Sequence, residues 1–119
     1  MICKWTTLKV SNLDNSLKFY KDILKMNVAS QFGTKDHQIV MLGEPEGTKI
    51  ELIFEKGVSI NNPGNGVSIG VAVSNLDNLI ATLKSKDIPV EGPITPNPHI
   101  RFFFVKDPDG YTIQLLDEF

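Results

Sequence analysis

The sequence predicts an α+β fold built from two tandem βαβββ modules. Three observations lead to this fold class. The hexapeptide VSNLDN occurs at 10–15 and again at 73–78, a separation of 63 positions. The same separation carries EPEGTKIELI at 44–53 onto DPDGYTIQLL at 107–116 without a gap. Hydrophobic periodicity then gives each copy the order strand, helix and about three strands.

The first strands and the helix starts explain why the hexapeptide is repeated. The segments 6–10 and 69–73 are rich in β-branched residues, which favours strands. Asn12 and Asn75 follow them and are good N-cap residues for the helices that come next. The repeat is therefore interpreted as scaffold, a strand end followed by a helix cap. The alternative, that Asp14 is a catalytic acid, is less favoured because capping already explains the motif.

The helices and hairpins repeat in the same way. In the first copy, apolar side chains recur at helical spacing along one stripe, at Leu13, Leu17, Tyr20 and Leu24. Later in each copy come the tetrapeptides EPEG and DPDG, with proline second and glycine fourth, as a type I turn prefers. Each tetrapeptide therefore predicts a hairpin between the last two strands of its module.

Composition and charge limit the classes of function. The 119 residues are 41% hydrophobic and 22% charged, which suits one globular domain over 1–119. We expect module one over about 1–57, a linker over about 58–66 and module two over about 67–119. The formal charge of −2 contains no block of like charges, so neither nucleic acid nor a membrane is expected as a partner. One cysteine, no long apolar run and no leader-like start predict a cytoplasmic location.

Two segments carry a resemblance to a known family. The helix SLKFYKDILKM at 16–26 and the hairpin FFFVKDPDGYTIQLL at 102–116 resemble the vicinal oxygen chelate superfamily. That superfamily includes glyoxalase I, bleomycin-resistance proteins and extradiol dioxygenases. Lys25 stands where the family usually has glycine. The resemblance implies curled mixed sheets that face each other to form a cleft, and a homodimer.

The resemblance also implies four positions that hold a divalent metal in many members. They are Trp5 and Ser68 on the first strands, and Glu51 and Gln114 on the last strands. The family usually has histidine or glutamine at the first pair and glutamate at the second. Indole has no lone pair to donate, and a serine hydroxyl is a poor ligand for nickel or zinc. We therefore expect no metal cofactor, with nickel or zinc only if the chain is a metal-dependent lyase.

Strand alternation gives the predicted site. Glu51 and Gln114 are expected to point into the cleft, and if the DPDG hairpin pairs Lys106 with Tyr111, Arg101 and Phe103 join them. Glu51 is the candidate catalytic residue, as a proton shuttle. The predicted ligand-binding residues are Trp5, Ser68, Arg101, Phe103 and Gln114. Trp5 either fills the cleft or stacks on a ligand.

Two hypotheses about function follow. In the first, the chain resembles the glyoxalase and bleomycin-resistance proteins and binds a small organic ligand in a cleft whose metal site is degenerate. In the second, it is a metal-dependent lactoylglutathione lyase-like lyase or isomerase that acts on the adduct of a 2-oxo compound. The sequence leaves open whether the protein is an enzyme.

Overall fold

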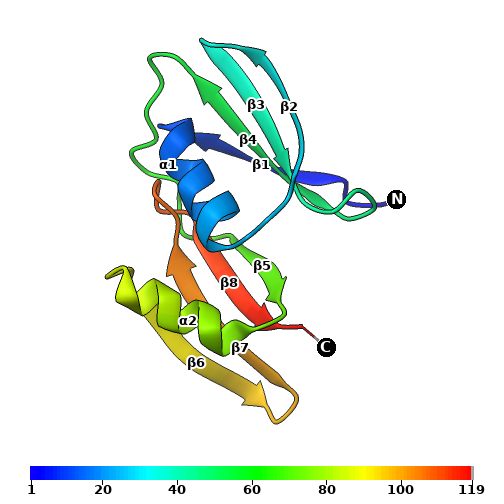
Figure 1. Cartoon of the computed structure of the whole chain (residues 1–119), viewed down its shortest axis with the longest axis vertical. Helices are drawn as coiled ribbons and strands as arrows, with labels where there is room; N and C mark the ends of the chain where they lie inside the picture. Colours follow the sequence, from blue (N-terminus) through cyan, green and yellow to red (C-terminus); the bar gives the residue numbers. More distant parts are fainter. Residues whose placement is uncertain (119) are drawn as a thin grey trace. The chain divides into compact units, whose positions relative to one another are not determined.

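The computed structural model describes residues 1–118 and divides into two compact units, 1–61 and 62 onward. Each unit contains one copy of the repeat, folded as a four-stranded mixed sheet with a helix against one face (Figure 1). No helix in the described part of the chain is long and apolar enough to cross a membrane.

Unit 1 has the strand order β1-β4-β3-β2. Strands β1 and β4 are parallel, and the other neighbours are antiparallel. The helix α1 continues into the wider π-helical turns of η1. The bounds are β1 Trp5–Val10, α1 Leu13–Leu17, η1 Lys18–Ile23, β2 Val28–Thr34, β3 His37–Leu42 and β4 Lys49–Glu55.

Unit 2 repeats this arrangement with the strand order β5-β8-β7-β6 and the parallel pair β5 and β8. Its bounds are β5 Ser68–Val73, α2 Leu76–Ser85, β6 Val90–Asn97, β7 Ile100–Lys106 and β8 Thr112–Asp117. The predicted α+β fold of two βαβββ modules is confirmed.

The repeated hexapeptide performs the same local task in both units. The N–H of Asn15 donates to Asn12 Oδ1 at 3.0 Å, and the N–H of Asn78 donates to Asn75 Oδ1 at 3.3 Å. Each asparagine therefore satisfies a backbone donor in the first turn that has no partner within the helix. The interpretation of VSNLDN as scaffold is confirmed.

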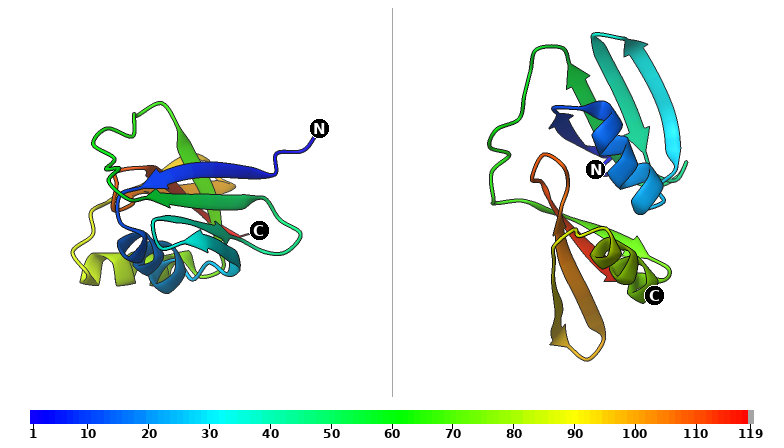
Figure 2. Two further views of the ribbon diagram at one scale, coloured as in Figure 1. Left: turned by 90° about the horizontal axis from the view of Figure 1, so that it is seen from above. Right: turned by 60° about the vertical axis from the view of Figure 1, so that its left-hand side comes forward.

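Each sheet buries the face that its helix covers (Figure 2). Side chains at alternate strand positions pack there, because successive residues of a strand point to opposite faces. In unit 1 the buried set is Leu8, Val10, Val40, Leu42, Ile50 and Leu52, and in unit 2 it includes Phe103, Val105, Ile113 and Leu115. The opposite face carries Trp5 and Glu51 in unit 1, and Ser68 and Gln114 in unit 2.

Both helices end on a residue in the left-handed region. Lys25 has φ 62° directly after the helix end at Leu24, and Asp87 has φ 58° directly after Lys86. Glycine is the usual residue at this place because it has no Cβ to crowd the carbonyl. The lysine that replaces the family's glycine therefore adopts the backbone conformation that glycine prefers.

Candidate ligand-binding faces

Two sheet faces, one in each unit, carry four of the candidate site residues, namely Trp5, Glu51, Ser68 and Gln114. The Glu51 face of unit 1 consists of Trp5, Thr7, Lys9, Phe32, Ile39, Met41, Lys49, Glu51 and Ile53, which share one side of the sheet by register. The Gln114 face of unit 2 consists of Ser68, Gly70, Ala72, Glu91, Ile94, Phe102, Phe104, Lys106, Thr112, Gln114 and Leu116.

Glu51 lies in the middle of its face, half-buried between β1 and β3. Thr7 is its neighbour on β1 and Met41 its neighbour on β3. The hydroxyl of Thr7 donates to Glu51 Oε1 at 2.6 Å. This short bond to a carboxylate fixes the side chain across the two parallel strands. Glu51 thus keeps one oxygen available for a group outside the sheet.

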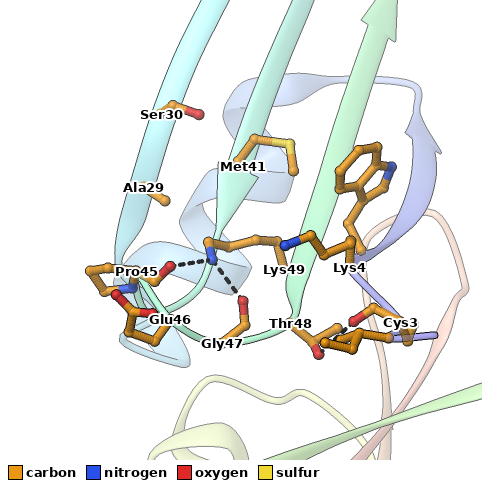
Figure 3. Close-up of a pocket in the computed structure, with 12 residues that line it drawn as sticks. Cys3, Lys4, Ala29, Ser30, Met41, Pro45, Glu46, Gly47, Thr48 and Lys49 are labelled. Atoms are coloured by element: carbon orange, nitrogen blue, oxygen red, sulfur yellow. Dashed lines mark hydrogen bonds between the residues drawn. The ribbon is translucent and has the colours of Figure 1, made fainter.

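Trp5 lines a hollow of about 500 Å³. Figure 3 shows the EPEG turn at the end of this hollow, with Lys49 bonded to Pro45 and Gly47. The indole is 53% exposed, so it does not pack as a core residue. Met41, Lys4 and Lys49 line the same hollow. The ammonium of Lys49 donates to the backbone carbonyls of Pro45, at 3.1 Å, and Gly47, at 2.7 Å. Lys49 therefore stabilises the EPEG turn at the end of the hollow.

The Gln114 face carries small residues along β5 and aromatic residues along β7. Gln114 has Gly70 beside it on β5 and Phe104 beside it on β7. The rings of Phe102 and Phe104 meet edge to face, with centroids 5.4 Å apart and planes at 74°. Ser68 and Phe104 line a hollow of about 300 Å³. This face offers an amide, hydroxyls and two half-buried rings, and Lys106 and Glu91, which line the same hollow, carry one charge of each sign.

The predicted orientation of Arg101 and Phe103 is wrong. Lys106 pairs with Thr112 rather than with Tyr111, which shifts the hairpin by one residue and turns every side chain of β7 to the other face. Phe103 is consequently buried under the helix, at 5% exposure.

The cause of the shift is the length of the hairpin loop. Gly110 adopts φ 94°, and its N–H donates to the carbonyl of Asp107 at 3.0 Å. Asp107 then pairs with Tyr111, because its N–H donates to the Tyr111 carbonyl at 3.0 Å. A type I turn followed by a left-handed glycine makes a three-residue loop, whereas the prediction assumed a loop of two. Phe104 instead lies beside Gln114, and Phe102 lies beside Leu116.

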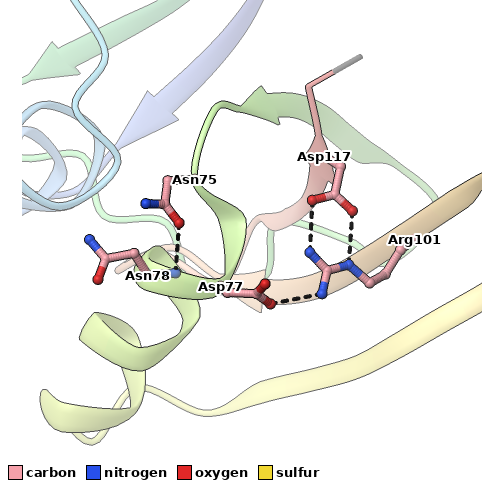
Figure 4. Close-up of polar contacts among 5 residues, drawn as sticks. All are labelled: Asn75, Asp77, Asn78, Arg101 and Asp117. Atoms are coloured by element: carbon pink, nitrogen blue, oxygen red, sulfur yellow. Dashed lines mark hydrogen bonds and ion pairs between the residues drawn. The ribbon is translucent and has the colours of Figure 1, made fainter.

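Arg101 connects three elements of unit 2 through its guanidinium group (Figure 4). Its Nε and Nη2 donate to the two oxygens of Asp117 at 2.8 and 2.7 Å, and its Nη1 donates to Asp77 at 2.7 Å. These bonds join β7 to β8 and to the first turn of α2. The hydrogen bonds from Arg101 lower the pKa of Asp117, while those to Asp117 and Asp77 raise the pKa of Arg101.

The residues at the four expected metal positions do not suit a transition metal. Glu51 is the one carboxylate among them, and the others are an indole, a hydroxyl and an amide. Nickel and zinc require imidazole, thiolate or several charged oxygens. Within residues 1–118, no three or more histidine, cysteine, aspartate or glutamate side chains gather closely enough to hold a metal ion. The donor set therefore disagrees with the metal that the fold family implies.

The fold and these faces define a member of a known class. The model of the glyoxalase/bleomycin resistance protein/dioxygenase superfamily matches residues 3–115, and the chain belongs to this family. The chain is 32% identical to a probable lactoylglutathione lyase of Vibrio cholerae, over 93% of this chain and 86% of that one. It is 30% identical to the lactoylglutathione lyase of Haemophilus influenzae, over 94% and 89%.

A solved structure agrees with this assignment. The trypanothione-dependent glyoxalase I of Leishmania major superposes with a TM-score of 0.84 at 31% identity, covering 99% of this chain and 87% of that one. The fold similarity therefore extends over the whole length of the present chain.

Proposed function

We propose that this chain is a lactoylglutathione lyase-like protein that acts on the adduct of a thiol and a small 2-oxo compound. The observation that carries the proposal is the full-length similarity to two lactoylglutathione lyases, at 30% and 32% identity. Glu51 supports it, since this chain keeps a carboxylate at one of the positions where the family has its proton-moving and metal-binding glutamates.

Glu51 would move the proton in this reaction. The carboxylate takes a proton from the carbon that bears sulfur and returns it to the neighbouring carbonyl carbon. The hydroxyl proton of the first carbon ends on the oxygen of the second. The first carbon is thereby oxidised to a thioester and the second reduced to an alcohol, so that no external oxidant is needed. Thr7, at 2.6 Å from Glu51 Oε1, would hold the carboxylate in place while its second oxygen meets the substrate.

A second candidate function is binding of a small organic molecule without turnover. The donor set at Trp5, Glu51, Ser68 and Gln114 favours it, because these residues do not fit the metal that polarises the substrate in the lyases. The comparisons favour the lyase-like candidate over this one.

One assay separates the two candidates. Isomerisation of the methylglyoxal–glutathione hemithioacetal is followed by thioester absorbance, with a chelator and then with added nickel or zinc. The lyase-like proposal expects turnover that Glu51→Gln lowers by roughly 10²- to 10⁴-fold. Asp22→Asn, an exposed change on η1, is the matched control and leaves turnover unchanged.

Calorimetry with S-lactoylglutathione, the reaction product, completes the comparison. Binding without turnover under either metal condition would favour the second candidate. Neither heat nor turnover would contradict both candidates.

A further inference from the structure

Glu51 is a carboxylate with no ion-pair partner among the described residues, on a sheet face that also carries apolar and aromatic side chains. Among residues 1–118, its one polar contact is the Thr7 hydroxyl, and no lysine, arginine or histidine forms an ion pair with it. We propose that the Glu51 face binds an organic ammonium ion, an amine with an apolar or aromatic body. This inference goes beyond the proposed function, since it concerns which ligands the face holds rather than turnover.

The two lysines of the face are directed to other acceptors. Lys9 Nζ lies 3.8 Å from Glu55 Oε1, and Lys49 Nζ donates to the carbonyls of Pro45 and Gly47. Neither lysine of the face therefore forms an ion pair with Glu51. A bound cation is the simplest group that can neutralise it.

The surroundings of Glu51 fit the apolar body of such a ligand. Met41 on β3 lies directly beside Glu51 on β4. The next pair of residues on this face is Ile39 on β3 and Ile53 on β4. These three apolar side chains are half-buried, so the carboxylate is only partly solvated. Partial removal of water strengthens a charge-assisted hydrogen bond between an ammonium and a carboxylate.

Exposed aromatic rings lie on the same face. Trp5 on β1 and Phe32 on β2 are each 53% exposed. Trp5 lies two residues before Thr7 on β1, and Thr7 is the neighbour of Glu51 on β4. The indole is therefore within reach of a group bound at the carboxylate. Indole is the aromatic ring that attracts a cation most strongly.

The hydrogen-bonding pattern of Glu51 favours a cationic ligand over an anionic or a neutral one. A carboxylate accepts hydrogen bonds and donates none, and Thr7 already supplies one donor. A ligand carboxylate would meet like charge, and a neutral alcohol would donate a weaker bond. An amine supplies both the donor and the opposite charge.

The single tryptophan of the chain makes the test direct, because its fluorescence reports on Trp5 alone. The protein is titrated with phenethylamine, 2-phenylethanol and phenylacetate, three probes of similar size that are cationic, neutral and anionic. We expect phenethylamine to change the emission of Trp5 and to bind about tenfold more tightly than the alcohol. Phenylacetate is expected to bind more weakly than the alcohol.

Two variants test whether the charge of Glu51 causes the preference for the amine. Glu51→Gln, an isosteric change, is expected to remove the preference for the amine, whereas Asp22→Asn removes an exposed carboxylate elsewhere and is expected to keep it. Circular dichroism confirms that both variants are folded. Equal affinity for amine and alcohol, no change with any probe, or a preference that survives in Glu51→Gln would overturn the inference.

The test is independent of the lyase-like proposal. An amine preference that depends on Glu51 supports the inference whether or not the hemithioacetal is turned over. Turnover without any amine preference would contradict the inference and leave the proposed function standing.

Discussion

The two units share one fold but differ in their exposed faces. Positions that correspond through the repeat carry Trp5 and Ser68, Thr7 and Gly70, and Glu51 and Gln114. On the buried faces the same correspondence joins apolar residues to apolar residues, as in Leu52 and Leu115, both fully buried. The duplicated scaffold has therefore kept its core, while the centre of one face carries a carboxylate and the centre of the other carries an amide.

The residues at the centres of the two faces differ in both chemistry and size. In unit 1 the Thr7 hydroxyl fixes Glu51 at 2.6 Å. In unit 2 the corresponding residue is Gly70, where an added Cβ would lie 3.6 Å from Gln114 Oε1 and 3.3 Å from Leu116 Cδ1. The glycine lets the side chains of Leu116 and Gln114 lie close to β5, whereas the threonine restrains the carboxylate. Unit 1 thus holds a hydrogen-bonded carboxylate, and unit 2 holds an amide that packs against a glycine.

The largest expected effect tests which side of β7 belongs to the core. Phe103→Ala removes a buried ring and is expected to lower the free energy of unfolding by about 3–5 kcal/mol. Phe104→Ala, on the half-buried Gln114 face, is expected to cost roughly half as much, because its ring buries less area. Urea denaturation of both variants measures the difference. A larger loss for Phe104→Ala would contradict the observed register.

The repeat was sufficient to predict the fold, the caps and the core of the first and last strands. These features depend on local patterns, namely N-cap asparagines and apolar alternation, which the sequence displays directly. The register of the last hairpin was not predictable in the same way. The DPDG motif fits a loop of two or of three residues, and the backbone of Gly110 decides between them.

The composition of the faces was accordingly predicted in part. Trp5, Ser68, Glu51 and Gln114 lie on the exposed faces where alternation placed them. Phe102 and Phe104 were missed because of the one-residue shift, and Met41 because the EPEG turn predicted the β3–β4 hairpin without its register. The roles of these residues in ligand binding stay predictions.

A smaller effect is expected at the Arg101 cluster, which has no counterpart of the same kind in unit 1 among residues 1–118. Arg101→Met removes the hydrogen bonds to Asp117 and Asp77 while keeping an unbranched apolar stem. We expect a lower urea midpoint at pH 7, and a smaller dependence of that midpoint on acid.

The sign of the acid dependence follows from the pKa of Asp117, which Arg101 lowers in the folded protein. A lowered pKa stabilises the fold above the ordinary aspartate range, and this contribution is lost as pH falls below about 4. The native chain should therefore lose more stability between pH 5 and pH 3 than Arg101→Met, roughly over the range where aspartate titrates. Equal losses in the two proteins would show that the cluster does not couple to folding.

The smallest expected effect concerns the helix ends, where the two units resemble each other. Lys25 and Asp87 both occupy left-handed positions, at φ 62° and 58°. Aspartate tolerates this conformation better than lysine does. Lys25→Gly is expected to raise the free energy of unfolding by about 0.5–1 kcal/mol, and Asp87→Gly by less. Lys25→Ala keeps a Cβ and is the matched control, with no gain expected in thermal or urea melts. A gain for alanine equal to that for glycine would show that the lysine side chain, rather than the backbone angle, limits stability at this position.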